Sequence, residues 1–378
     1  MQAFMRFEWR RFWSDIKNKT AALILIGLSL YLAIGVEREY EPIRSFDSEP
    51  IAATLQDADY FLETKDPEMY QRSFISFSLL KELSEDLLAA LEQEDYREAI
   101  VLEEDYYRAM SSRYEGEDPN YYIYGMNESE RTQLQVYDGI AYGQYSNFLL
   151  ESDLYLTQPI LEGKTVGQSL ARSWMGVMPV ILLVLGLIFG IDFFASDSQH
   201  ETIADAFPFT SYKKSWGRTF VVWLASGALL IIAEIVFVAA LSFFRDWGGI
   251  DLLVPGILNE RTVFSFLAQA HSLVFLALLI LLRIGSWAGQ IFKNSLVMIL
   301  LIPSLLIPYL LDIGRNARFV RQFSWIPLSF FQPGNIVSGF QNFWHSSTRF
   351  TFASEMMALI MGLLFVELII YFTLKQQS

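Results

Sequence analysis

Few residue types in this chain could carry catalytic chemistry. The 378-residue sequence contains no cysteine, and its histidines, His200, His271 and His345, lie in three separate segments. His200-Glu201 begins like the zinc-binding motif H-E-x-x-H, but residue 204 is alanine, so the second histidine ligand is missing. Neither the phosphate-binding pattern G-x-x-x-x-G-K-S/T nor the nucleophile pattern G-x-S-x-G occurs. The sequence therefore predicts no catalytic residue, no metal site and no cofactor held by this chain.

Polar side chains inside apolar runs are the stronger functional candidates. Glu234 and Glu367 each lie well inside such a run, where a charge costs roughly 3 kcal/mol or more unless it is neutralised or faces water or protein. Each could line a transport pathway, or be protonated or hydrogen-bonded so that it seals a helical bundle or a dimer interface. Gln269 and His271 pose the same choice, and for them the sealing role is favoured.

The composition excludes a soluble protein, because 53% of the residues are hydrophobic and only 19% are charged. A hydrocarbon core about 30 Å thick is crossed by about 20 apolar residues in a helix. None of the apolar runs alternates as a barrel strand would. We therefore predict an α-helical, polytopic membrane protein with six transmembrane helices, at Thr20–Val36, Trp174–Ala195, Thr219–Phe244, Val263–Leu282, Ser295–Leu311 and Met356–Leu374.

The acidic residues are concentrated in one inserted segment. Residues 37–172 hold 29 Asp or Glu and 11 Lys or Arg, a net charge of −18 within a chain total of −14. This charge argues against nucleic acid and anionic lipid as partners of the segment. We predict a mainly helical extracellular domain here, with helix starts at Ser48-Glu49-Pro50 and Asp66-Pro67 and later helices over Asp95–Met110 and Ser129–Leu150.

The basic residues of the short segments predict the orientation. Eleven lie on the side of the termini and six on the other side, so both termini are expected in the cytosol. A signal peptide is the competing interpretation of the N-terminus, but the first apolar run is too long and no A-x-A site follows it. The absence of cysteine fits a bacterial cell membrane. The two sets are Arg6, Arg10, Arg11, Lys17, Lys19, Lys213, Lys214, Arg218, Arg283, Lys293 and Lys375, against Arg245, Arg261, Arg315, Arg318, Arg321 and Arg349.

Two further segments flank the apolar runs. Residues 1–19 place aromatic side chains among basic ones, which predicts an interfacial amphipathic helix. Residues 314–354 are aromatic but broken by Pro327, Pro333 and Gly334, which predicts a helical hairpin in the outer leaflet. Between them, Pro303 and Pro308 should kink or shorten the fifth span.

The polar segment 196–218 resembles the D/E…GT…LPxSR…K segment of ABC-2 type ABC transporter permeases. Its matching residues are Asp197, Glu201-Thr202, Ala206-Phe207-Pro208 and Lys213 or Lys214, although Glu201 stands where the family usually has Gly. Phe7-Glu8-Trp9-Arg10-Arg11 is similar to the elbow helix of that family, and the hairpin has the place of its re-entrant helix pair. The resemblance covers residues 1–36 and 171–378, and a subset of the family has a large extracellular insertion between the first two spans.

The resemblance implies three parts and a function. Residues 1–36 would be the elbow helix and first span, 37–172 the extracellular domain, and 173–378 the remaining five spans. The chain would be the membrane-spanning half of an exporter for a hydrophobic or amphipathic substrate, such as a peptide antibiotic, a bacteriocin or a lipid. Its partners would be ABC ATPase subunits, which hold ATP and Mg, a second or related permease, and membrane lipids.

The resemblance implies one group of site residues, and the distribution of arginines indicates a second. The coupling segment 196–218 would dock on the ATPase through an apolar knob flanked by lysines: Phe207, Pro208, Phe209, Tyr212, Lys213 and Lys214. Arginines around the hairpin run against the positive-inside bias, so they should meet lipid phosphates or, alternatively, an anionic group of the cargo or the acidic insertion. These are Arg315, Arg318, Arg321 and Arg349.

A second class of function stays open on the sequence alone. The chain could be a membrane sensor or scaffold whose acidic domain binds a partner while nothing crosses the membrane. An intramembrane enzyme would require a constellation of catalytic residues that the sequence lacks.

Overall fold

The computed structural model describes residues 2–38, 40, 46–117, 128–195, 208–258, 260–292, 296–311, 316, 320, 327 and 332–375. The elements of these residues are helices, with one isolated antiparallel bridge between Leu253 and Thr262. The chain divides into two compact units, which we call the membrane unit (Met1–Tyr40 with Val166–Ser378) and the inserted unit (Glu41–Thr165). The prediction of an α-helical protein is confirmed for the described residues.

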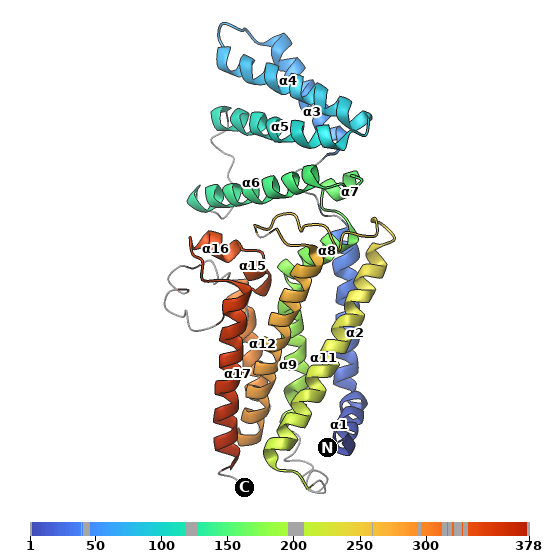
Figure 1. Ribbon diagram of the computed structural model, residues 1–378, viewed down its shortest axis with the longest axis vertical. Coiled ribbons are helices and arrows are strands. Elements are labelled where there is room, and N and C mark those ends of the chain that lie inside the picture. Colours follow the sequence, from blue (N-terminus) through green and yellow to red (C-terminus); the bar gives the residue numbers. More distant parts are fainter. Residues whose placement is uncertain are drawn as a thin grey trace. The chain divides into compact units, whose positions relative to one another are not determined.

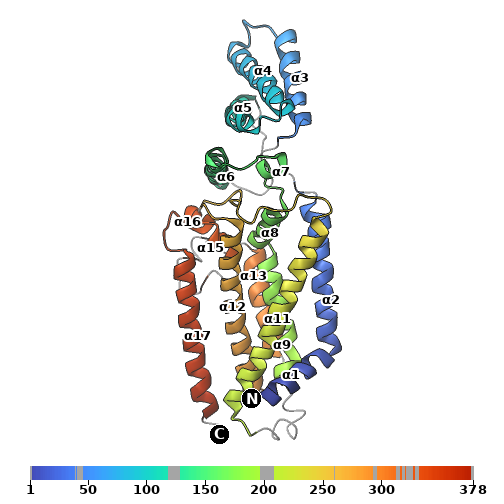
Figure 2. The same cartoon turned by 45° about the vertical axis from the view of Figure 1, so that its right-hand side comes forward.

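The N-terminus of the membrane unit forms two helices that are broken at Asp15. Helix α1 (Gln2–Ser14) precedes α2 (Ile16–Tyr31), which continues into a π-helical turn, η1 (Leu32–Glu37). Asp15 has extended backbone angles and caps α2 by accepting from the backbone N–H of Lys17 at 2.9 Å. This break lets α1 lie at an angle to α2 at one end of the bundle (Figure 2).

The second predicted span is bent. It consists of α8 (Val166–Met175) and α9 (Met178–Ala195), which meet at 63°. Gly176 lies in the break, and Pro179 lacks an N–H at a position of the first turn of α9 where no intrahelical partner is needed. We predicted that the second span begins at Trp174. In the structure Trp174 belongs to α8, and the straight helix α9 begins only at Met178.

The membrane unit contains three long apolar helices. These are α11 (Ser211–Leu241), α12 (Val263–Phe292) and α17 (Phe352–Lys375). Compared with the predicted spans, α11 begins eight residues earlier and α12 ends ten residues later, because helix geometry continues through polar residues that packing buries. Arg218 and Arg283, which we predicted in cytosolic loops, therefore lie inside helices and are buried. Figure 1 shows these helices running side by side.

By length and composition, the described helices include four that could cross a membrane, or five if the bent pair is one span. The fifth predicted span corresponds to α13 (Leu296–Leu310), which is short and contains Pro303 and Pro308. The prediction of six spans is therefore not confirmed. The membrane unit is nevertheless that of a membrane protein, since apolar side chains of α17 such as Met357, Leu364 and Phe365 are exposed.

Two short helices represent the predicted hairpin. They are α15 (Pro333–Val337) and α16 (Phe340–Trp344), separated by a turn in which Gly339 has a φ of 82°. A Cβ on Gly334 would lie 2.5 Å from the Cα of Met175 and 2.6 Å from the carbonyl oxygen of Trp174. The hairpin thus packs against the end of α8 with backbone next to backbone.

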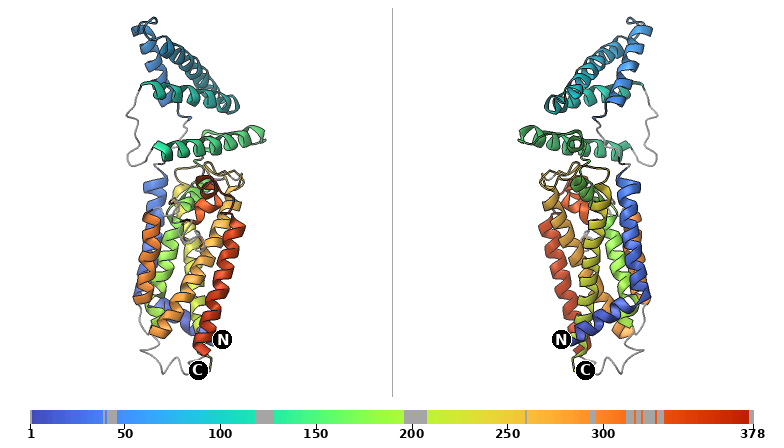
Figure 3. Two further views of the ribbon diagram at one scale, coloured as in Figure 1. Left: turned by 90° about the vertical axis from the view of Figure 1, so that its left-hand side faces the viewer. Right: turned by 90° about the vertical axis from the view of Figure 1, so that its right-hand side faces the viewer.

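The inserted unit is helical, as predicted. Figure 3 shows its helices α3, α4 and α5. Phe61 and Phe77 stack between α3 and α4 with ring centroids 4.0 Å apart. Asp66-Pro67 begins a turn and not a helix, which corrects that prediction, since the next helix starts at Gln71. The elements are α3 (Ser48–Thr64), α4 (Gln71–Glu92), α5 (Tyr96–Glu117), α6 (Glu128–Glu151) and α7 (Gln158–Leu161).

Candidate functional site

Glu367 of α17 forms an ion pair with Arg283 of α12. Arg283 donates from Nε to Oε1 of Glu367 at 2.5 Å and from Nη2 to Oε2 at 2.9 Å, a two-pronged geometry that aligns the two planar groups. The arginine side chain is fully buried and that of Glu367 is 16% exposed. Glu367, an isolated charge in an apolar run of the sequence, is therefore neutralised by Arg283, which we predicted to lie in a cytosolic loop.

Side chains from the start of α11 complete this Glu367 cluster. The Tyr212 hydroxyl donates to Oε2 of Glu367 at 2.9 Å, and the Trp216 indole N–H lies 3.0 Å from the same oxygen. Arg283 also donates to the Ser215 hydroxyl at 2.8 Å. The cluster, which fastens α11, α12 and α17 to one another, comprises Glu367, Arg283, Tyr212, Trp216, Ser215 and Ser286, whose hydroxyl lies 2.7 Å from that of Ser215.

A second cluster joins α8, α11 and α12. Oε1 of Glu234 lies 2.7 Å from the indole nitrogen of Trp174, which donates to it, and 2.7 Å from Nε2 of His271. The indole and imidazole rings stack at 3.8 Å with an angle of 29°. Glu234 and His271, singled out separately in the sequence, are thus brought together, whereas Trp174 was missed as a partner. We call these three residues the Glu234 cluster.

Gln269 is not part of the Glu234 cluster. Its amide oxygen accepts from the guanidinium of Arg261, which precedes α12. Burial lowers the pKa of Arg261. Residues two apart on a helix point in different directions, so Gln269 and His271 have different partners.

Glu8 of α1 holds the start of α11. Its Oε1 accepts from Nε of Arg218 at 2.8 Å, and both side chains are almost completely buried. Arg11 lies 3.3 Å from the second oxygen of Glu8. Next to this pair, Phe4 and Phe209 meet edge to face with ring centroids 6.1 Å apart. The amphipathic N-terminal helix is thus bonded to the start of α11, where the predicted coupling segment ends.

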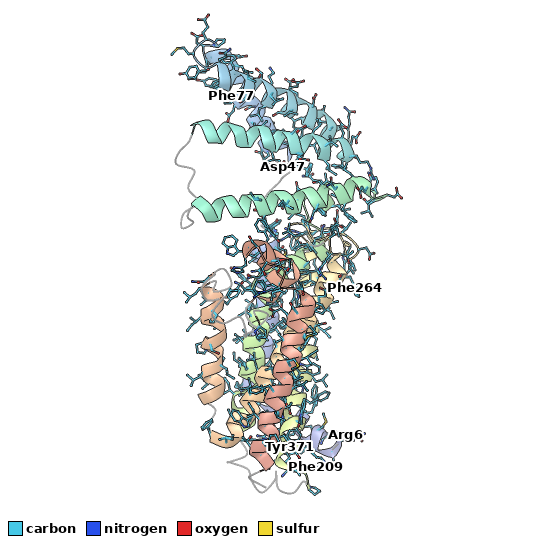
Figure 4. All side chains as sticks on the ribbon, turned by 60° about the vertical axis from the view of Figure 1, so that its left-hand side comes forward. Arg6, Asp47, Phe77, Phe209, Phe264 and Tyr371 are labelled. Carbon is cyan, nitrogen blue, oxygen red and sulfur yellow. The ribbon has the colours of Figure 1, made fainter. Side chains whose placement is uncertain are left out.

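The predicted docking residues differ in exposure. Pro208 and Lys213 are exposed, and Phe209 is half-buried against α1. Figure 4 shows Phe209 at the same end of the membrane unit as Arg6 and Tyr371, with Phe264 at the other end. Tyr212 directs its hydroxyl to Glu367, so its polar end is occupied within the bundle. Lys214 is half-buried, and Phe207 lies outside the described residues.

A further carboxylate at the other end of α2 was missed by the sequence analysis. Glu37 accepts from Nη2 of Arg172 at 2.8 Å, and the guanidinium of Arg245 donates to the Glu37 backbone carbonyl. Both arginines also donate to the hydroxyl of Ser169. The signal that could have found these contacts is a basic residue at the border of one apolar run and an acidic residue at the border of another.

The predicted outer arginines are only partly described. Arg349 is exposed and belongs to the turn that precedes α17, where its carbonyl oxygen accepts from the Ser354 hydroxyl at 2.5 Å. Arg315, Arg318 and Arg321 lie in the part of the chain that the structure does not describe. Their proposed contact with lipid or cargo stays a prediction.

Comparisons of the chain with protein-family models, with curated proteins and with solved structures found no match. The possible functions of this chain therefore depend on what its described side chains can do. These include no group of three or more residues that could hold a metal ion. What they do provide is a set of carboxylates that each bond a cationic or N–H donor on another helix, namely Glu8, Glu37, Glu234 and Glu367. Such pairs fix the positions of the helices relative to one another. A displacement or a proton can pass from one helix to another through them.

Proposed function

We propose that this chain is the membrane-spanning subunit of an ABC exporter of the ABC-2 type, driven by separate ATPase subunits. The observation that carries the proposal is the bond between Glu8 and Arg218, which joins an amphipathic N-terminal helix to the last residue of the predicted coupling segment, in the first turns of α11. A permease that responds to an external ATPase needs a stiff connection of this kind. A freely hinged segment would absorb the displacement before it reached the spans.

The contacts around that bond support a route for displacement into the bundle. Pro208 and Lys213 are exposed at the start of α11. In the next two turns of α11, Ser215 and Trp216 belong to the Glu367 cluster, and Arg218 contacts Glu8. Movement of residues 208–214 would therefore displace α1, α12 and α17 as well as α11. Close-packed interiors transmit such shifts because they cannot deform continuously.

The substrate class follows from the same proposal. We infer a hydrophobic or amphipathic cargo, such as a peptide antibiotic, a bacteriocin or a lipid, because the membrane unit exposes apolar side chains on several helices. The enclosed cavity lined by Leu185, Phe189 and Leu278 is too small for any such cargo. A pathway would then lie between this chain and a second or related permease at the cell membrane.

The experiment reconstitutes the full chain with the ATPase that copurifies with it and measures ATP hydrolysis stimulated by amphipathic peptides and lipids. We expect Phe209→Ala to weaken association with the ATPase about tenfold, equivalent to about 1.4 kcal/mol. Phe264→Ala is the matched control, because Phe264 is an exposed aromatic residue at the other end of the same unit. Its association should be unchanged.

Two results would contradict the proposal. Association that survives Phe209→Ala together with Phe207→Ala would move the docking site elsewhere. A chain that purifies with no ATPase and shows no stimulated hydrolysis would instead favour a sensor or scaffold whose inserted unit binds a partner.

A further inference from the structure

Both ring nitrogens of His271 face oxygen atoms. Nε2 lies 2.7 Å from Oε1 of Glu234, and Nδ1 lies 2.6 Å from the backbone carbonyl oxygen of Leu267. A carbonyl oxygen only accepts hydrogen bonds, so Nδ1 must carry a hydrogen. In a neutral imidazole Nε2 is then an acceptor, and the hydrogen between Nε2 and Oε1 requires an additional proton.

That additional proton can reside on either partner. With the proton on Nε2, His271 is an imidazolium and Glu234 a carboxylate; with the proton on Oε1, both groups are neutral. In both arrangements the pair holds two protons and has no net charge. Removing one would leave a net negative charge among apolar helices, which costs several kcal/mol.

Trp174 supports the ionised arrangement. Its indole N–H donates to the same Oε1 at 2.7 Å, which stabilises a carboxylate. Its ring stacks on the imidazole at 3.8 Å, a position in which an aromatic face attracts a cation. Trp174 itself is fully buried. One side chain thus stabilises both charges of the pair.

We propose that Glu234, His271 and Trp174 form a proton-binding site at the junction of α8, α11 and α12, which takes up and releases one proton. This inference does not depend on the proposed exporter function. It assigns to the bundle a ligand, the proton. Release of the proton would place the lone pair of Nε2 against a carboxylate and so weaken the junction of the three helices.

Other charged groups on the surrounding helices bond elsewhere. On α8, Arg172 binds Glu37; on α12, Arg283 lies 12 residues from His271, about 18 Å along the axis, and binds Glu367. The helix α15, which packs against α8 and α12, has no titratable residue. The other described charged side chains of these elements and of α17 are Arg218, which binds Glu8, Arg261 before α12, which binds Gln269, the exposed Lys213, the half-buried Lys214 and the buried Glu355 near the start of α17.

The test is nitrogen NMR of the full chain, labelled with ¹⁵N in histidine and embedded in lipid nanodiscs at neutral pH. The chain has only three histidines, so His271→Gln identifies the signals of His271, and His345→Gln is the control that should leave them in place. Infrared spectra of the wild type and of Glu234→Gln locate the proton when it resides on the carboxyl group. We expect either two protonated ring nitrogens on His271 or one protonated nitrogen together with a carboxylic acid band that Glu234→Gln removes.

The second proton should depend on Glu234. In Glu234→Gln, His271 should lose its second ring proton at neutral pH, and the variant should bind one proton fewer per chain than the wild type.

A milder variant keeps the proposal testable if Glu234→Gln does not fold. Trp174→Phe retains an aromatic ring but removes the N–H donor to the carboxylate. The shared proton should then move from Nε2 of His271 toward Glu234, seen as a weaker signal of the doubly protonated ring and a stronger carboxylic acid band, since the ionised carboxylate loses a hydrogen bond. A neutral His271 beside an ionised Glu234 in the wild type, or a shift in the opposite direction for Trp174→Phe, would overturn the proposal.

Discussion

At the scale of single residues, the Arg283–Glu367 pair has an asymmetric effect on stability. Forming a buried ion pair requires both groups to lose their hydration, and their attraction offsets this loss only in part. Removing one partner is different, since it leaves the other charge buried without a counter-charge. Arg283 is fully buried. The pair therefore determines how helices pack more than it determines how stable the bundle is.

We predict that Arg283→Met and Glu367→Leu each destabilise the chain by about 3–5 kcal/mol, and that the double variant loses much less than the sum. Thermal unfolding of the full chain in detergent, followed by circular dichroism, measures the three differences. The exposed Lys81–Asp59 pair is the control, because solvent screens an exposed pair and its loss should change stability little. Additive losses in the double variant would contradict a specific pairing of these two charges.

At the scale of elements, the hairpin and α8 approach each other at Gly334. The glycine brings α15 against the backbone of Met175 and Trp174, next to the bend between α8 and α9. Any side chain at this position must displace backbone, which is less adaptable than the end of a side chain. The position of α15 therefore depends on the absence of one Cβ atom.

We predict that Gly334→Ala destabilises the membrane unit by about 1–3 kcal/mol, because its methyl group would lie 2.5 Å from a backbone carbon. Gly362→Ala in α17 is the matched control, since a Cβ there meets nothing within 4 Å. It should be neutral or stabilise the helix by up to about 1 kcal/mol. Thermal unfolding compares the two variants, and equal stability would argue against the close packing of α15 on α8.

At the scale of the whole molecule, the two units differ in the surface that they present. The membrane unit exposes large apolar side chains on α2, α11 and α17, whereas the inserted unit belongs to the acidic part of the chain. Apolar faces of this extent are stable in lipid and not in water. The orientation of the chain in the membrane stays a prediction from its basic residues. Two of those, Arg218 and Arg283, are buried in ion pairs and no longer count as loop residues.

The absence of cysteine provides a direct test of orientation. Glu68→Cys in the inserted unit and Lys213→Cys at the start of α11 are exposed positions, and each variant has a single thiol. A membrane-impermeant maleimide should label Glu68→Cys in intact cells and Lys213→Cys only after permeabilisation. The reverse pattern would invert the predicted topology and remove residues 208–214 from contact with a cytosolic ATPase.

What the sequence alone determined follows from local pattern. The apolar runs identified a helical membrane protein, and the predicted helices over Asp95–Met110 and Ser129–Leu150 correspond to α5 and α6. Periodicity and length are properties of neighbouring residues, so they can be read without knowledge of the fold. The same reasoning identified Glu234 and Glu367 as unusual, because the cost of a charge depends on its own apolar surroundings.

Only the tertiary structure decided which groups those carboxylates contact. Glu367 lies 84 residues from Arg283, and Trp174 lies 60 residues from Glu234. Whether such residues meet depends on how each helix is rotated and where it ends, and packing between helices determines both. The lengths of α11 and α12 could not be predicted from local pattern either. Arg218 and Arg283 were expected to lie just outside the helices, but each is buried in an ion pair, so the helix continues through it. Local sequence pattern can identify a charged residue in an apolar run. Its partner is far away in the sequence, however, and the two residues come into contact only when the helices pack together.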